Sequence, residues 1–478
     1  MSFIRLAVVL LLLMTGSVAC SSDPEEKAKV QPVVHEAAPV PKDRDPAAVL
    51  SALRKIDACA LLGPAPGKVP IGPHGCRAAT ALTIRLGAAL SMDARDKLEV
   101  LVIGGAKAYR NLPLWTDACD VFLPVSFTQT IKISSKEKPK GCAAAEKAAA
   151  TAVRLLAKPA AIPVIPAAAR WDACTVLGHV LGASAGKLAA GDAGLDDCEQ
   201  VPTNRSDMAA VARVATLSFR YGPQLRYRDM EPLGGRKIYK LVGNGCRVPW
   251  NQGTSGAKDP EFGQREIELK AADCAEAKRL AVATMKTLST APPAGPGFAG
   301  ALTYGVMEPD SPRAGGCREL PVKPACEPYH PVDVPSGGAV EVVRQVDADP
   351  NVLCAIAVDV VWDRLGPRFQ PVTRVGSDER TPECVFVEPS HELKVTVGLT
   401  DGWKRAPSGT VQKEFSGHPG VLDTPIPTLT QATVAVTNEI HLSVTFSFGP
   451  PRGRAKPNDV DRSAEIEPLT NAIVGKYF

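Results

Sequence analysis

Cysteine spacing constrains the fold of this chain more than any other feature of its sequence. The chain has 478 residues and 13 cysteines. Two long stretches carry four cysteines each, in the same order and among similar neighbours. The two sets are Cys59, Cys76, Cys119 and Cys142, and Cys174, Cys198, Cys246 and Cys274. Such self-similarity predicts a duplicated module.

The residues around these cysteines repeat as well. Three features follow one another in both stretches: the openings at 56–63 and 171–178, the glycine turns at 104–110 and 234–240, and the alanine-rich helices that begin at Cys142 and Cys274. Runs of alternating apolar residues between these features predict strands. The agreement in cysteine order, residue types and element order makes duplication the best-supported inference from the sequence.

A third, degenerate copy follows. Cys354 and Cys384 stand where its first cysteine pair should be, and residues 393–397 and 432–448 alternate as strands do. The second pair is missing, whereas Cys317 and Cys326 lie just ahead of the copy, close enough in sequence for a small closed loop.

The expected fold class is therefore α+β, with three tandem disulfide-stapled modules. Each module should be an antiparallel sheet with packed helices. Proline-, glycine- and alanine-rich linkers at 158–169 and 291–300 separate the copies. The expected spans are module 1 at 46–157, module 2 at 170–289, and module 3, with its extra cysteine loop, at 301–478.

Disulfides explain the cysteines better than a metal site does. Structural zinc sites use close pairs such as C-x-x-C, and no two cysteines here are closer than nine positions. Spacing alone leaves three connectivities open for four cysteines. The third copy favours sequential pairing, because it keeps the first pair and loses both members of the second. The expected disulfides are Cys59–Cys76, Cys119–Cys142, Cys174–Cys198, Cys246–Cys274, Cys317–Cys326 and Cys354–Cys384.

The N-terminus predicts export. Arg5 precedes an apolar run at 6–14 that is too short to span a bilayer, and small residues lead to Cys20, so 1–19 is expected to be a signal peptide. Residues 17–20 resemble a lipobox, with Ser17 where leucine is usual, and they also suit ordinary signal peptidase. Lipidation of Cys20 is preferred, because it leaves twelve cysteines to pair. Residues 20–45 then form a flexible tether that holds the protein at the outer side of the cell membrane.

The combination of a D-x-C-x-x-L opening, a cysteine before a strand, a glycine-rich turn and a closing helix resembles a known family. It is the actinobacterial lipoprotein family catalogued as domain of unknown function 3558. The resemblance covers 46–157 and 170–289 well, and 340–478 weakly. It departs from the family at Ala58 and Ala173, where proline is usual, and in carrying tandem copies. It implies an α+β cell-surface lipoprotein and no catalytic residues.

Motifs for catalysis are weak. Residues 182–186 fit G-x-S-x-G but lie in a small-residue loop, and 295–300 fit G-x-G-x-x-G inside a linker. The seven histidines show no metal-ligand spacing, and Asp196-Asp197 is expected to be a solvated turn. We therefore expect no catalytic residues, no metal and no cofactor.

One stretch indicates binding. Its basic and aromatic residues could line a single sheet face toward an anionic envelope polymer, a glycan or lipid headgroups. They are Arg220, Tyr221, Arg226, Tyr227, Arg228, Arg236, Lys237, Tyr239 and Lys240. The net charge of +4 is small for this length, and an exported chain is not expected to meet nucleic acid.

These observations favour a non-enzymatic lipoprotein of the cell envelope, with a binding or scaffolding role and a membrane anchor. The first alternative is a surface carrier of a lipid or other apolar ligand, which requires a continuous apolar cavity. The second is an exported hydrolase, which requires a serine, a histidine and an acid that converge in space.

Overall fold

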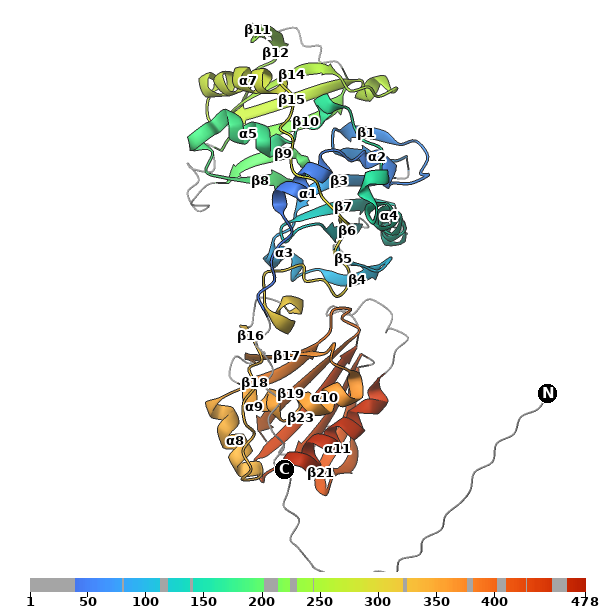
Figure 1. Ribbon diagram of the computed structural model, residues 1–478, viewed down its shortest axis with the longest axis vertical. Coiled ribbons are helices and arrows are strands. Elements are labelled where there is room, and N and C mark those ends of the chain that lie inside the picture. The colour runs from blue at the N-terminus through green and yellow to red at the C-terminus, as the bar shows by residue number, and fades with distance from the viewer. Residues whose placement is uncertain are drawn as a thin grey trace, which may run out of the picture. The chain divides into compact units, whose positions relative to one another are not determined.

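The computed structural model describes residues 39–478, apart from 80, 112–118, 138–140, 202–213, 224–229, 244, 321–324, 376–380, 402–409, 427 and 449–461. Cys20 and the expected signal peptide lie outside the described residues, as do Arg226, Tyr227 and Arg228. The described chain mixes helices with three antiparallel sheets and contains six disulfides (Figure 1). The expected α+β class is therefore confirmed.

The first sheet has the strand order β1-β2-β3-β7-β6-β5-β4. Its strands are β1 (Val69–Gly72), β2 (Gly75–Arg77), β3 (Leu82–Ala89), β4 (Glu99–Ile103), β5 (Ala106–Asn111), β6 (Cys119–Pro124) and β7 (Gln129–Ser135). Its helices are α1 (Pro46–Leu53), α2 (Ala58–Leu61), α3 (Met92–Arg95) and α4 (Gly141–Leu156). Alanines of α4 pack on Ile131 and Ile133 of the central strand in one apolar core.

The second sheet has the order β8-β9-β10-β15-β14-β12-β11, with β13 paired to β14 beside that path. Its strands are β8 (Lys187–Gly191), β9 (Gly194–Val201), β10 (Thr216–Gly222), β11 (Glu231–Leu233), β12 (Arg236–Ile238), β13 (Leu241–Gly243), β14 (Gly245–Thr254) and β15 (Gln264–Ala271). Helices α5 (Ala173–Leu181) and α7 (Cys274–Leu288) pack on one face, where Trp250 is fully buried.

The third sheet has the order β16-β17-β18-β19-β23-β22-β21-β20. Its strands are β16 (Cys326–Pro328), β17 (Gln370–Val375), β18 (Pro382–Val387), β19 (Leu393–Asp401), β20 (Val411–Phe415), β21 (His418–Ile426), β22 (Leu429–Ala435) and β23 (Ile440–Phe448). Its helices are α8 (Ala339–Ala348), α9 (Asn351–Ala355), α10 (Val358–Leu365) and α11 (Ile466–Tyr477). All four contribute buried residues to one core with the sheet.

The disulfides join equivalent elements in the three sheets. One kind links the short helix that precedes each sheet to the second strand of that sheet, where the strands of the third sheet are counted from β17. A second kind links the start of the closing helix to a central strand. The first kind is Cys59–Cys76, Cys174–Cys198 and Cys354–Cys384; the second is Cys119–Cys142 and Cys246–Cys274. Cys317–Cys326 closes the extra loop. These are the sequential pairs expected from the sequence.

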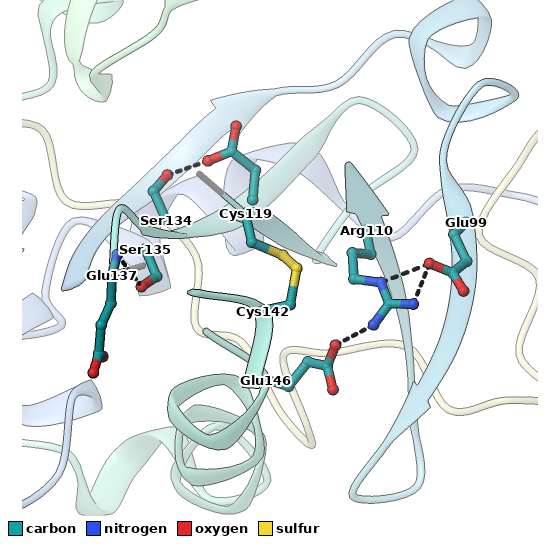
Figure 2. Close-up of a disulfide and its surroundings, with 9 residues drawn as sticks. Glu99, Arg110, Cys119, Ser134, Ser135, Glu137, Cys142 and Glu146 are labelled. Atoms are coloured by element: carbon teal, nitrogen blue, oxygen red, sulfur yellow. Dashed lines mark hydrogen bonds and ion pairs between the residues drawn. A yellow bond between two sulfur atoms is a disulfide. The ribbon is translucent and has the colours of Figure 1, made fainter. Parts of the chain in front are cut away.

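The Cys119–Cys142 disulfide lies beside an ion-pair group that also holds α4 (Figure 2). Arg110 Nε donates to Glu99 Oε2 at 2.6 Å, and its Nη1 donates to Glu146 near the start of the helix. Burial alone would lower the pKa of Arg110, but hydrogen bonds to Glu99 and Glu146 outweigh burial and raise it. A disulfide and a charged contact therefore fix the same end of α4.

The repeated sequence motifs occupy repeated local structures. Asp57 and Asp172 each accept a backbone hydrogen bond as the N-cap of the helix that carries the first cysteine. The glycine pairs at 104–105 and 234–235 have φ of +58° and +82°, and of +56° and +78°. Two consecutive positive φ angles are those of a type I′ hairpin turn, which explains glycine at these positions.

In the part of the chain that the structure describes, none of the helices combines the length and the apolar character needed to cross a bilayer.

Candidate functional site

The predicted binding residues do not share one face of the second sheet. Ile238 and Phe219 are buried on the side that α5 and α7 cover. Because side chains alternate along a strand, Arg236 and Tyr221 lie on that same side, whereas Lys237, Tyr239 and Arg220 lie on the opposite, open side. Lys240 is exposed just beyond β12.

The open side of the second sheet has mixed charge. Glu266 stands opposite Arg220 across the β10–β15 ladder, and Glu268 lies 3.9 Å from Arg247. Each of these glutamates thus has an arginine neighbour. The sequence missed them because they come from β15, which lies outside the basic stretch.

A buried carboxylate fastens the first sheet to the second. Asp196, expected to lie in a solvated turn, is fully buried, and so is His74 in the turn between β1 and β2. Both Asp196 oxygens accept from the backbone N–H of His74 at 3.0 Å, and Oδ1 lies 2.8 Å from His74 Nδ1. The solvated-turn expectation is wrong, because this hairpin from another part of the chain covers Asp196.

Two further contacts belong to the same junction. A side chain at Gly72 would clash with the Asp196 carboxylate, so glycine lets the hairpin approach closely. Arg54, at the end of α1, pairs with Asp172, the N-cap of α5. Burial raises the pKa of the nearby Tyr221 to about 12, aided by the negative charge of Asp196 and opposed by Arg265. We name the contact between His74 and Asp196 the Asp196 junction.

The densest group of buried charges lies on the first sheet at Lys107. Lys107 Nζ is fully buried, 2.9 and 3.0 Å from the Glu319 oxygens and 3.4 Å from Asp310 Oδ1. Tyr109 donates its hydroxyl to Asp310 Oδ2 at 2.7 Å, and Arg95 Nη1 donates to the same oxygen at 2.9 Å. We name these five residues the Lys107 cluster.

The Lys107 cluster also reaches the third sheet. Glu319 lies in a short 3₁₀ turn, Gly315–Glu319, that packs against β17 and β18. His391, in the turn before β19, places Nε2 2.9 Å from Glu319 Oε2. Burial would raise the pKa of Glu319, but Lys107 and His391 outweigh burial and lower it to about 2. The carboxylate therefore stays ionised while it joins the two sheets.

The segment that brings Asp310 to the first sheet was expected to belong to module 3, which was placed at 301–478. Instead, Leu302 is fully buried in the first core, and Tyr304 O accepts from the Lys107 backbone N–H at 3.0 Å. Arg44 donates to the carbonyl oxygens of Ala301 and Thr303 and pairs with Glu308 at 2.7 Å. No periodicity marks this stretch, so its docking on the first sheet could not be predicted from the sequence.

The Lys107 cluster is filled by its own groups. The cavity at its edge has a volume of about 40 Å³ and is lined by Arg95, Tyr109, Glu319 and His391 among others. A space of that size admits little more than a water molecule. Because Asp310 and Glu319 are each held by several donors, the arrangement suits joining segments rather than binding a substrate.

Ser184 is the serine of the G-x-S-x-G motif at 182–186 and lies in an exposed turn after α5. Its hydroxyl donates to the carbonyl oxygen of Leu181 at 2.7 Å, within the same turn. A nucleophile elbow requires a strand that runs into the turn and a helix that leaves it, whereas here a helix precedes and β8 follows.

The fold and the buried charges together define a disulfide-linked α+β protein whose sheets are joined by ion pairs. Comparisons with protein-family models, curated proteins and solved structures found no match. The resemblance to the lipoprotein family therefore remains a proposal.

Proposed function

We propose that this chain is an exported, non-enzymatic protein of the cell envelope that binds or scaffolds a partner. The observation that carries the proposal is the use of its buried charges. Asp196 joins the first sheet to the second, and Glu319 joins the first sheet to the third. Ion pairs of this kind favour a fixed arrangement of segments, which suits a protein that presents surfaces.

Tandem duplication of one module is part of this proposal. Equivalent strand orders in the three sheets support it, as do the equivalent disulfides of the short helices. Duplication would explain why the third copy lacks both cysteines of the second disulfide and not just one of them. A lipoprotein module of the resembled family, repeated along one chain, would place several surfaces on one anchor.

Attachment through a lipid on Cys20 is the other part. Six disulfides fit an oxidising, extracytoplasmic location. With its signal peptide removed, the chain would be held at the membrane by its modified N-terminus. The tether would be shorter than the expected 20–45 and would end before Asp43, which accepts a hydrogen bond from the Phe127 N–H.

The anchor is tested by the substitution Cys20→Ser. The variant should move from the membrane fraction to the soluble extracytoplasmic fraction, and incorporation of radiolabelled palmitate should be lost. Tyr221→Phe, a change far from the N-terminus, serves as the control and should stay in the membrane fraction. Retention of the Cys20→Ser variant in membranes would contradict lipid anchoring.

A carrier of an apolar ligand is the second candidate. Two neighbouring cavities of about 360 and 270 Å³ lie beside α8 and share Val346, Asp347 and Pro382. Leu399 and Ile440 add apolar lining to one of them. Lipid that co-purifies with the chain and is lost in a Val346→Asp variant would favour this candidate over scaffolding.

A further inference from the structure

The two cavities beside α8 have an apolar lining. They share Val346, Asp347 and Pro382, and their volumes are about 360 and 270 Å³. Further apolar lining comes from α8, from β19 and from β23, and it includes Val343, Leu399 and Ile440. We name the two cavities together the α8 cleft. Cavities of this size are typical of sites that bind small organic molecules.

The charged lining of the α8 cleft is mostly acidic. Asp347 lines both cavities, Glu327 lines the larger and Asp401 lines the smaller, and all three residues are exposed. Within the described chain, none of these carboxylates has an ion-pair partner. The described lining contributes one cation, Arg374, and its Nε donates to Glu383 Oε2 at 2.8 Å. The described lining therefore has an excess of negative charge.

The C-terminal end of α8 adds to this negative potential. Its last turn contains no basic residue, and its C-cap is Asp349. The C-terminal end of a helix carries a partial negative charge, so that cations are stabilising there and carboxylates are not. Asp349 accepts hydrogen bonds from the backbone and side chain of Asn351. Asp347 has no such donor among the described residues, so a cation beside it would be favoured by both the carboxylate and the helix end.

We propose that the α8 cleft binds a small amphiphilic amine, a molecule with an apolar body and one protonated amino group. The ammonium group lies at Asp347, where the two cavities meet, and the apolar body lies against Val346 and its neighbours. The same carboxylates disfavour a fatty acid or another anionic lipid. The inference rests on the second candidate function, a carrier of an apolar ligand, and it names the chemical class of that ligand.

The experiment compares three water-soluble probes of equal length, which are hexylamine, hexanol and hexanoate. Each is titrated at neutral pH into the full chain in non-ionic detergent, and binding is followed by ligand-observed NMR. Hexylamine should bind about fivefold more tightly than hexanol, because contacts with exposed carboxylates are individually weak. Hexanoate should bind more weakly than hexanol.

A pair of double variants tests whether the cleft is the source of this preference. Asp347→Asn with Asp401→Asn should make hexylamine and hexanol bind equally. Glu199→Gln with Glu414→Gln removes the same charge from β9 and β20, outside the cleft, and should keep the preference. All four side chains are exposed, so neither double variant should disturb folding.

Two outcomes would overturn the inference alone: hexanol or hexanoate that binds as tightly as hexylamine, or an equal loss of preference in both double variants. Binding of hexanol without a preference for the amine would leave the carrier candidate standing. A chain that binds none of the three probes would contradict both the inference and the carrier candidate.

Discussion

Single carboxylates hold the sheets of this protein together, and Asp196 is the clearest case. Its two oxygens accept from the backbone N–H of His74, and it lies next to the His74 ring nitrogen, with no exposure to solvent. Removal of a buried acceptor leaves donors unsatisfied in a low-dielectric environment, which costs more than the contact itself contributes.

Asp196→Ala should therefore lower the free energy of unfolding by about 3 kcal/mol. Urea unfolding followed by tryptophan fluorescence measures the change, since Trp250 is fully buried in the second core. Asp197→Ala is the matched control: its carboxylate is only partly buried and bonds Ser218, so the loss should stay below about 1 kcal/mol. Equal losses in the two variants would contradict the Asp196 junction.

Sequence reasoning could not find this residue. Asp196 and His74 are 122 positions apart and come from different sheets, although each stands two positions before the second cysteine of its set. Alternation and spacing report which side of its own sheet a residue occupies. They do not report what a hairpin from elsewhere in the chain will cover.

At the scale of elements, the three sheets and their helices are most alike where backbone conformation and disulfides set the structure. Cysteine order and glycine turns are local features that the sequence predicted. The aspartate N-caps of the two short helices are local as well, but only the structure shows them. The residues of the predicted binding face do not lie on one side of the sheet, and the reason is local too. Neighbours along a strand, such as Arg220 and Tyr221, point to opposite sides. The docking of 302–311 was missed because it depends on distant partners.

The closing helix is fastened in different ways in the second and third sheets. Cys246–Cys274 ties α7 to β14, whereas α11 is held by Asn471, whose Oδ1 accepts from the Ser416 N–H at 2.8 Å. Lys413 and Glu467 form an ion pair at the same contact. In the third sheet, hydrogen bonds and an ion pair therefore hold the closing helix, whereas a disulfide holds it in the second sheet.

Replacement of both Cys246 and Cys274 by Ala should lower the free energy of unfolding by about 3 kcal/mol, because the bridge closes a loop with a sequence separation of 28. Thermal unfolding followed by circular dichroism should show a lower Tm for part of the signal. The double replacement of Cys317 and Cys326, with a separation of 9, should cost less. A larger loss in the second variant would contradict the chain-entropy argument.

At the scale of the whole molecule, the arrangement of sheets depends on pH through Glu319. Its pKa is lowered in the folded protein to about 2, mainly because Lys107 and His391 outweigh its burial. A lowered pKa contributes stability that is complete above the unfolded value of about 4.3 and is lost as the pH falls toward about 2.

Acidification from pH 6 to pH 3 should therefore weaken the junction between the first and third sheets in the natural chain. Glu319→Gln should already be less stable at pH 6, by about 2 kcal/mol, and its stability should depend less on pH over the same interval. Urea unfolding at a series of pH values measures both effects. Parallel pH profiles for the variant and the natural chain would exclude Glu319 as their source.

The disulfides have a consequence for how this chain would fold during the proposed export. Each of the six joins cysteines between 9 and 30 positions apart, and none crosses another along the chain. A chain that emerges from a translocation channel with its N-terminus first can close every bridge soon after the second cysteine appears. Oxidation can thus keep pace with secretion, and no cysteine has to wait for a partner that is still on the other side of the membrane.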